Sequence, residues 1–109
     1  MAEGKGTGIA YEFGLRPEDL ELIRAVFRRH PEVHQVKIFG SRATGHFEDP
    51  SDIDLALWEE LNARLLGRIL GELDELPLPH TFDVAAYEAI SHPLLRRRID
   101  ETGKLLYEG

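Results

Sequence analysis

Residues 38–45 and 51–56 of this chain read Ile-Phe-Gly-Ser-Arg-Ala-Thr-Gly and Ser-Asp-Ile-Asp-Leu-Ala, and these two segments decide the fold. The first closes an apolar run, rich in β-branched residues, that begins at Val33 and is cut off by Gly40. The second alternates acidic and apolar side chains, as a strand with one buried face does. Each segment therefore predicts a strand that carries polar residues at its end or on one face.

Helical and strand patterns alternate along the rest of the chain. Apolar residues recur at helical spacing after Pro17 until Pro31 stops the run. Further helices are predicted from about 61 to 73 and 93 to 102, strands at 33–39, 52–57 and 81–86, and a short extension at 105–107. Interleaved strands and helices indicate an α/β or α+β domain, with a small sheet packed against helices.

The length of the chain favours a single domain. Of its 109 residues, 15–109 are expected to form that domain, after a flexible lead-in over 1–14 that carries four glycines. No apolar run approaches the roughly 18 residues of a membrane span, and residues 1–14 lack the apolar segment of a signal peptide. We therefore expect a cytoplasmic protein.

Charge and cysteine content exclude several classes of function. A formal net charge of -7 disfavours binding to free nucleic acid, which requires a basic face. It does not exclude a nucleotide, because carboxylates can hold the magnesium that accompanies a triphosphate. The absence of cysteine removes disulfides, thiolate metal sites and cysteine nucleophiles.

The acidic pair Asp52 and Asp54 is the first candidate site. Residues two apart on a strand point to the same face, so both carboxylates converge while Ile53 and Leu55 point into the core. Like charges held this close are costly unless a cation lies between them, and magnesium prefers such oxygen ligands. The alternative is that Asp52 caps a turn and Asp54 is solvated on an edge strand.

Gly40 and Ser41 form the second candidate site. Glycine after a strand lets the backbone approach a phosphate, and the Ser41 hydroxyl with neighbouring N–H groups can hold phosphate oxygens. Neither a P-loop nor a Gly-x-Gly-x-x-Gly motif is present. Taken alone, the Gly-Ser pair also fits an ordinary turn.

Together, segments 38–45 and 51–56 resemble the signature of the DNA polymerase beta-like nucleotidyltransferase superfamily, and most closely its minimal, MNT-type branch. The resemblance extends from about Leu20 to the end of the chain. It implies the polymerase beta-like fold with a small mixed sheet, ATP as substrate and magnesium as cofactor. Transfer of a nucleotidyl group, AMP in the case of ATP, to an acceptor hydroxyl is the activity it implies.

The resemblance also assigns roles to residues. It implies a third carboxylate on a neighbouring strand, for which Asp83 is the best match and the candidate general base. Two magnesium ions would be held by Asp52, Asp54 and Asp83, with Gly40, Ser41 and Arg42 binding the nucleotide. Arg42 could equally be solvated, and Asp83 could be an ordinary aspartate at a turn or strand edge.

The resemblance suggests a partner as well. The minimal branch is commonly encoded with a helical HEPN protein, and its members act as antitoxins that add AMP to a tyrosine of this RNase toxin. Such a hetero-complex would supply the acceptor for which this chain has no further domain. Two alternatives remain open: a non-catalytic subunit that masks the HEPN partner, and a transferase for small molecules similar to the aminoglycoside enzymes.

The remaining polar and aromatic residues are predicted to be structural. The five histidines have no metal-ligand spacing and are expected at the surface or in turns. Glu72, with Asp74 and Glu75, is typical of a solvated helix face. The basic run 96–98 is expected to be solvated, although it could meet an acidic partner or the triphosphate. Trp58 and Tyr87 are expected in the core or at its rim.

Overall fold

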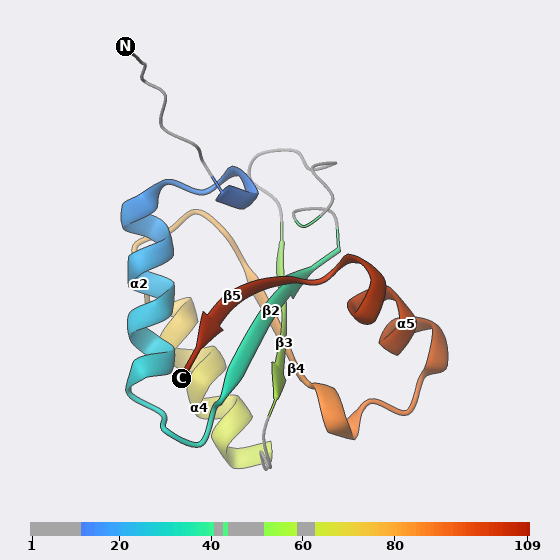
Figure 1. The fold of residues 1–109 in the computed structure, drawn as a ribbon. Helices are drawn as coiled ribbons and strands as arrows, with labels where there is room; N and C mark the ends of the chain where they lie inside the picture. Colours follow the sequence, from blue (N-terminus) through green and yellow to red (C-terminus); the bar gives the residue numbers. More distant parts are fainter. Residues whose placement is uncertain (1–11, 41–42, 44–51, 59–62) are drawn as a thin grey trace.

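The computed structural model describes residues 12–40, 43, 52–58 and 63–109, which form one sheet with helices on both faces (Figure 1). The strands are β2 (Gln35–Phe39), β3 (Ile53–Trp58), β4 (Phe82–Ala86) and β5 (Lys104–Glu108). The helices are α2 (Pro17–Arg28), α4 (Ala63–Asp74) and α5 (Pro93–Thr102), with 3-10 turns η1 (Glu12–Gly14) and η2 (Tyr87–Ala89).

The sheet is mixed and has the order β4-β3-β2-β5. Strand β2 pairs antiparallel with β3 and with β5, whereas β3 pairs parallel with β4. The parallel pair needs a crossover, and α4 lies in the chain between those two strands. The α/β (α+β) class predicted from the sequence is confirmed.

One face of the sheet holds the main core. Helices α2 and α4 lie together on this side in Figure 1, away from α5. Their apolar side chains pack against the alternate strand residues that point the same way. The fully buried members are Ile23, Val26 and Phe27 of α2, Val36 and Ile38 of β2, Ile53, Leu55 and Leu57 of β3, and Ile69 and Leu73 of α4.

The opposite face carries a smaller cluster under α5. Ile99 of α5 is fully buried against Phe39 of β2 and Ala56 of β3. Beside it, the rings of Trp58 and Tyr87 are stacked with their centroids 4.3 Å apart. This face is covered by one short helix, so it leaves strand residues accessible at its margin.

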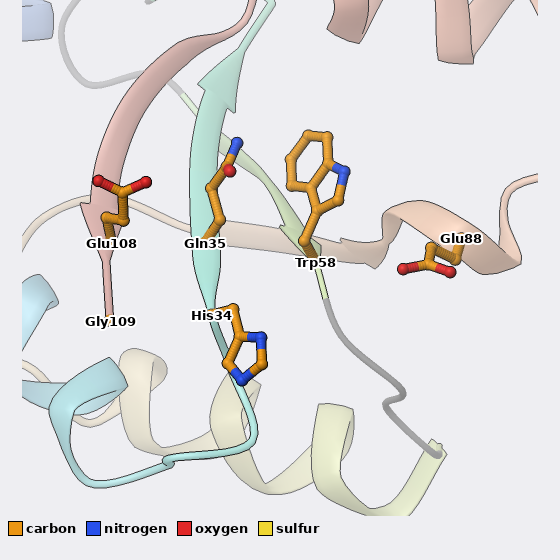
Figure 2. A pocket seen from close by; sticks show the side chains of 6 residues that line it. All are labelled: His34, Gln35, Trp58, Glu88, Glu108 and Gly109. Carbon is orange, nitrogen blue, oxygen red and sulfur yellow. The ribbon is translucent and has the colours of Figure 1, made fainter.

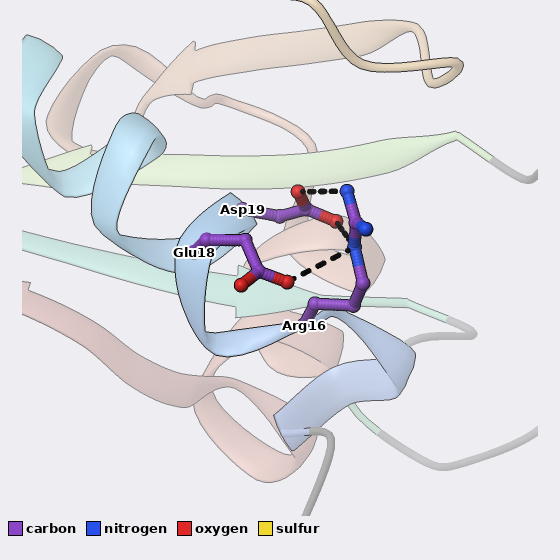
Figure 3. A network of polar contacts seen from close by, with 3 residues as sticks. All are labelled: Arg16, Glu18 and Asp19. Atoms are coloured by element: carbon purple, nitrogen blue, oxygen red, sulfur yellow. Dashed lines mark hydrogen bonds and ion pairs between the residues drawn. The ribbon is translucent and has the colours of Figure 1, made fainter.

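The start of α2 is fixed by a local ion network (Figure 3). Pro17 begins the helix, and the Arg16 guanidinium donates to both oxygens of Asp19 at 3.0 and 3.2 Å. Glu18 adds an ion pair at 3.3 Å to Arg16. Asp19 is buried, and its negative charge in the first helical turn stabilises the helix by its favourable interaction with the helix dipole.

The structure differs from the sequence prediction at several element ends. The first helix ends at Arg28, three residues before Pro31, and β2 begins at Gln35 rather than Val33. The short extension predicted at 105–107 is part of strand β5, a type that the prediction did not assign. Its backbone completes the free edge of β2, which the local sequence does not reveal.

His30 and Glu72 also depart from the prediction. His30 was expected at the surface or in a turn; its carbonyl accepts the Val33 N–H in a turn, but its side chain is not at the surface, since it is only 8% exposed. Its Nε2 lies 3.0 Å from Oε1 of Glu72, and Arg29 donates to the same oxygen at 3.2 Å. Glu72 is therefore not part of a simple solvated face: it joins α4 to the end of α2.

The expected lead-in 1–14 is only partly within the described residues. Residues 1–11 lie outside them, whereas Phe13 in η1 packs against the main core and Leu15 is buried. In the described part of the chain, no helix combines the length and apolar character that crossing a membrane requires.

Candidate functional site

Asp54 and Asp83 lie next to each other on adjacent parallel strands. They are register partners in the β3–β4 pair, so their side chains leave the same face of the sheet. Asp54 is partly buried and Asp83 is exposed. Their neighbours Ile53 and Leu55 point into the main core, as the alternation in the sequence predicts.

Asp52 directly precedes β3 and is tied to the strand that carries Asp83. The Thr81 hydroxyl donates to Oδ1 of Asp52, and the Ile53 N–H donates to the Thr81 carbonyl at 2.9 Å. Asp52 is exposed, so its carboxylate reaches solvent at the strand start. The alternative that Asp54 occupies an edge strand is wrong, because β3 lies between β4 and β2.

The surroundings of Asp54, at the corner of the sheet formed with Asp52 and Asp83, disfavour the ionised form of its carboxyl when no metal is bound. Burial raises the pKa of the Asp54 carboxyl above its ordinary value, and the negative charges of Asp83 and Asp52 raise it further. The positive charge of Arg98 acts in the opposite direction. A cation placed among these carboxylates would relieve the repulsion.

Gly40 provides the space in front of Asp54. It follows β2 with φ +80°, in the left-handed region that favours glycine, and its carbonyl accepts the Ala43 N–H at 3.2 Å. A Cβ on Gly40 would lie 2.8 Å from Oδ2 of Asp54. Phe39, the residue before it, is the register partner of Asp54. The absence of a side chain at Gly40 therefore keeps the carboxylate in place and accessible.

The structure thus brings four of the predicted site residues together: Gly40, Asp52, Asp54 and Asp83. Ser41 and Arg42 lie outside the described residues. Arg98 belongs to the basic run 96–98, which was expected to be solvated or to meet an acidic partner or the triphosphate, and it was not among the predicted site residues. The signal in the sequence is the helical spacing of the apolar residues Leu95 and Ile99, which both pack against the cluster under α5.

The donor set at this corner suits a hard cation. In the described ranges, no three His, Asp or Glu side chains converge closely enough to form a complete metal site. Magnesium does not require one, since it is usually held by one or two protein carboxylates together with phosphate oxygens and water. The crowded carboxylates beside Gly40 therefore fit magnesium that arrives with a triphosphate.

A separate polar pocket opens at the other end of the strands (Figure 2). Its lining residues are His34, Gln35, Trp58, Glu88, Glu108 and Gly109. Gln35 and Trp58 are register partners, whereas Asp54 lies four positions earlier on β3, about 13 Å away at ~3.3 Å per residue. This pocket is therefore distinct from the carboxylate site.

Comparison with known proteins agrees with the fold. Residues 21–109 match the family model described as "Polymerase beta, Nucleotidyltransferase". This range contains every residue of the candidate site. No curated protein sequence matches the chain.

Three solved structures share the fold at low sequence identity. One, a toxin–antitoxin with AMP-PNP, has TM-score 0.70 and 22% identity over 83% of this chain and 73% of that chain. An MntA–HepT toxin–antitoxin has TM-score 0.65 and 20% identity over 86% and 74%. A tri-AMPylated Shewanella oneidensis HEPN toxin in complex with its MNT antitoxin has TM-score 0.65 and 20% identity over 84% and 71%.

Proposed function

This chain belongs to the polymerase beta nucleotidyltransferase family, and we propose that it transfers AMP from ATP to an acceptor hydroxyl with magnesium as cofactor. The observation that carries the proposal is the pairing of Asp54 with Asp83 beside the side-chain-free position Gly40. Two carboxylates next to open backbone are what a magnesium triphosphate needs, because the oxygens hold the cation and the backbone admits the phosphates.

Asp52 and Asp54, with Asp83, are the residues that would hold magnesium. When bound, magnesium supplies positive charge that offsets the negative charge of the triphosphate and of the departing pyrophosphate. Asp52 is held in position by the Thr81 hydroxyl, and Asp54 by its place between two strands. Gly40 supports binding by leaving room for the Asp54 carboxylate, and Ser41 and Arg42, outside the described residues, are proposed to contact the phosphates.

Asp83 is proposed to act on the acceptor. Its exposed carboxylate lies beside Asp54, so it can take the proton of an acceptor hydroxyl placed above the pair. The acceptor oxygen then bonds to the α-phosphorus, while the bond between that phosphorus and the bridging oxygen of the β-phosphate breaks. Pyrophosphate leaves with the electron pair of that bond, and AMP remains on the acceptor.

We further propose that the acceptor is a tyrosine of a HEPN-type partner protein, which would make this chain an antitoxin. The toxin–antitoxin complexes of the same fold support this partner, and the AMPylated HEPN toxin supports the modification. A partner that docks over the exposed carboxylate of Asp83 would bring its hydroxyl to the bound nucleotide, which raises the rate as an intramolecular reaction does.

The test is a transfer assay with isotope-labelled ATP and magnesium, in which the chain is incubated alone and with the proposed HEPN-type partner. Label on the partner and a mass increase by whole AMP units, absent with the Asp52→Asn, Asp54→Asn double variant, are the expected results. If the double variant neutralises the partner equally well with no mass change, the chain is a masking subunit. Efficient labelling of an aminoglycoside instead would identify a small-molecule transferase.

A further inference from the structure

Arg98 lies near the carboxylate site, and its side chain is not part of the apolar cluster that holds α5 on the sheet. It precedes Ile99, whose burial against Phe39 and Ala56 fixes the position of α5 on the sheet. Both contacts flank Asp54: Phe39 is its register partner on β2, and Ala56 lies two residues along β3 on the same face. Ile99 therefore holds this part of α5, and Arg98 with it, next to the corner of the sheet that contains Asp54.

The Arg98 guanidinium is available to an anion. It is exposed, and it forms no hydrogen bond or ion pair with another described residue. Its charge nevertheless reaches Asp54, whose pKa it lowers against the opposing effects of burial, Asp83 and Asp52. Arg98 is thus close enough to act on the site while its five N–H donors remain unoccupied by the described part of the chain.

The neighbouring arginine Arg96 shows the contrast. Its guanidinium lies 4.6 Å from the centre of the Tyr87 ring and donates to the Ile90 carbonyl at 3.1 Å. Arg96 therefore secures α5 to η2. Arg97 is exposed and is not among the charges that act on Asp54. Three consecutive arginines on α5 thus have three different surroundings, and Arg98 alone combines a free guanidinium with proximity to Asp54.

Arg98 also borders a hollow on the surface. With His92, Leu94 and Leu95 it lines a cavity of about 390 Å³ along one side of α5. His92 caps the start of this helix, since its Nδ1 accepts the Leu95 N–H at 3.3 Å. Arg98 therefore borders an accessible cavity, and its charge also acts on Asp54 of the carboxylate site.

We propose that Arg98 is a nucleotide-binding residue whose guanidinium contacts the phosphate chain of the triphosphate from the α5 side. The inference rests on the proposed function. A triphosphate that approaches three aspartates in a chain of net charge -7 requires positive charge beyond the metal, and a guanidinium fits phosphate oxygens in pairs. Because Ile99 fixes α5 on the sheet, the backbone of Arg98 is in position before the nucleotide arrives.

Calorimetric titration with ATP and magnesium tests the proposal on four proteins: the wild type, Arg98→Ala, Arg98→Gln and Arg97→Ala. Loss of a charged hydrogen bond to phosphate should weaken ATP binding about 10- to 100-fold in both Arg98 variants. Arg97→Ala removes the same charge one residue away and should change affinity less than about twofold, the size expected from net charge alone.

The outcomes separate the inference from the proposed function. Equal ATP affinity in Arg98→Gln, Arg97→Ala and the wild type would overturn the role of Arg98 while leaving nucleotidyl transfer intact. A lower melting temperature with unchanged affinity would also overturn it, since it would assign Arg98 a purely structural part. Arg98→Gln keeps most of the side chain, so it remains informative if Arg98→Ala does not fold. A wild type that binds no ATP would overturn both proposals.

Discussion

Gly40 and Asp54 are packed so closely that a Cβ on Gly40 would lie 2.8 Å from Oδ2 of Asp54. Gly40→Ala should therefore displace the carboxylate and also place alanine at φ +80°, where the backbone strain is roughly 1–2 kcal/mol. We expect lower stability to denaturant and a loss of nucleotidyl transfer larger than the loss of folded protein. Thermal denaturation together with the labelled transfer assay measures both.

The control for this variant is Gly67→Ala. Gly67 lies within α4, and a Cβ there would meet no atom within 4 Å. Alanine is favoured over glycine inside a helix by up to about 1 kcal/mol, so this variant should be as stable as the wild type or more so, with unchanged transfer. Equal behaviour of the two variants would contradict the proposed contact between Gly40 and Asp54.

The second prediction concerns Glu72, which links α4 to the end of α2 through His30 and Arg29. Burial opposes ionisation of Glu72, but the hydrogen bond and charge of His30, together with Arg29, outweigh it and lower the pKa of Glu72 below its ordinary value of 4.5. Glu72→Gln should therefore cost about 1 kcal/mol of unfolding free energy at neutral pH. Denaturant unfolding, with the exposed Glu75→Gln as control, measures the cost.

The pH dependence of that cost follows from the direction of the shift. A carboxylate with a lowered folded-state pKa stabilises the protein above pH 4.5, and this contribution is lost as the pH falls through the lowered value. The difference between Glu72→Gln and the wild type should accordingly shrink on acidification below pH 4.5. A difference that stays constant down to the acid limit would assign the effect to packing instead of charge.

The sequence predicts the part of the carboxylate site that depends on local alternation along one strand. Alternation around Asp54 places it opposite Ile53, and the structure confirms that these residues face opposite sides of the sheet. The position of Asp83 beside Asp54 follows from the parallel register of strands far apart in the chain, which periodicity cannot specify.

Two other features, strand β5 and the burial of His30, were not predicted from the sequence because they too depend on contacts between distant segments. Strand β5 is short, and it is a strand because β2 offers a free edge on which to pair. His30 contains no local signal of burial, since its partner Glu72 lies 42 residues further along the chain. Contacts between distant segments, rather than local propensity, decided both outcomes.

The repulsion at the carboxylate corner predicts a gain in stability from Asp54→Asn. Burial and the charges of Asp83 and Asp52 raise the pKa of Asp54, so its ionised form destabilises the metal-free protein at neutral pH. The variant should melt a few degrees higher than the wild type without magnesium. The gain should disappear as the pH falls through the raised pKa toward 3.8, because protonation then removes the charge from the wild type too.

Magnesium provides the internal control for that variant. A bound cation would relieve the repulsion only where the carboxylates remain, so magnesium with ATP should stabilise the wild type and not Asp54→Asn. The exposed Asp74→Asn on α4 removes an equal charge away from the site, so it should melt like the wild type without magnesium and be stabilised by magnesium with ATP as the wild type is. A wild type that magnesium and ATP leave unchanged in melting temperature would argue against a metal-nucleotide site at Asp54.

Asp83→Asn should separate nucleotide binding from transfer. Asp83 is exposed beside Asp54 and is proposed to take the acceptor proton, an event that belongs to the transition state and not to the bound triphosphate. Asparagine keeps the shape of the side chain but cannot accept that proton. Transfer to the acceptor should therefore fall roughly 10²- to 10⁴-fold, the usual contribution of a general base, while ATP affinity changes much less. Calorimetry and single-turnover labelling measured on the same protein give the two numbers. A steep loss of ATP affinity would make Asp83 chiefly a metal ligand, and transfer at the wild-type rate would remove it from the mechanism.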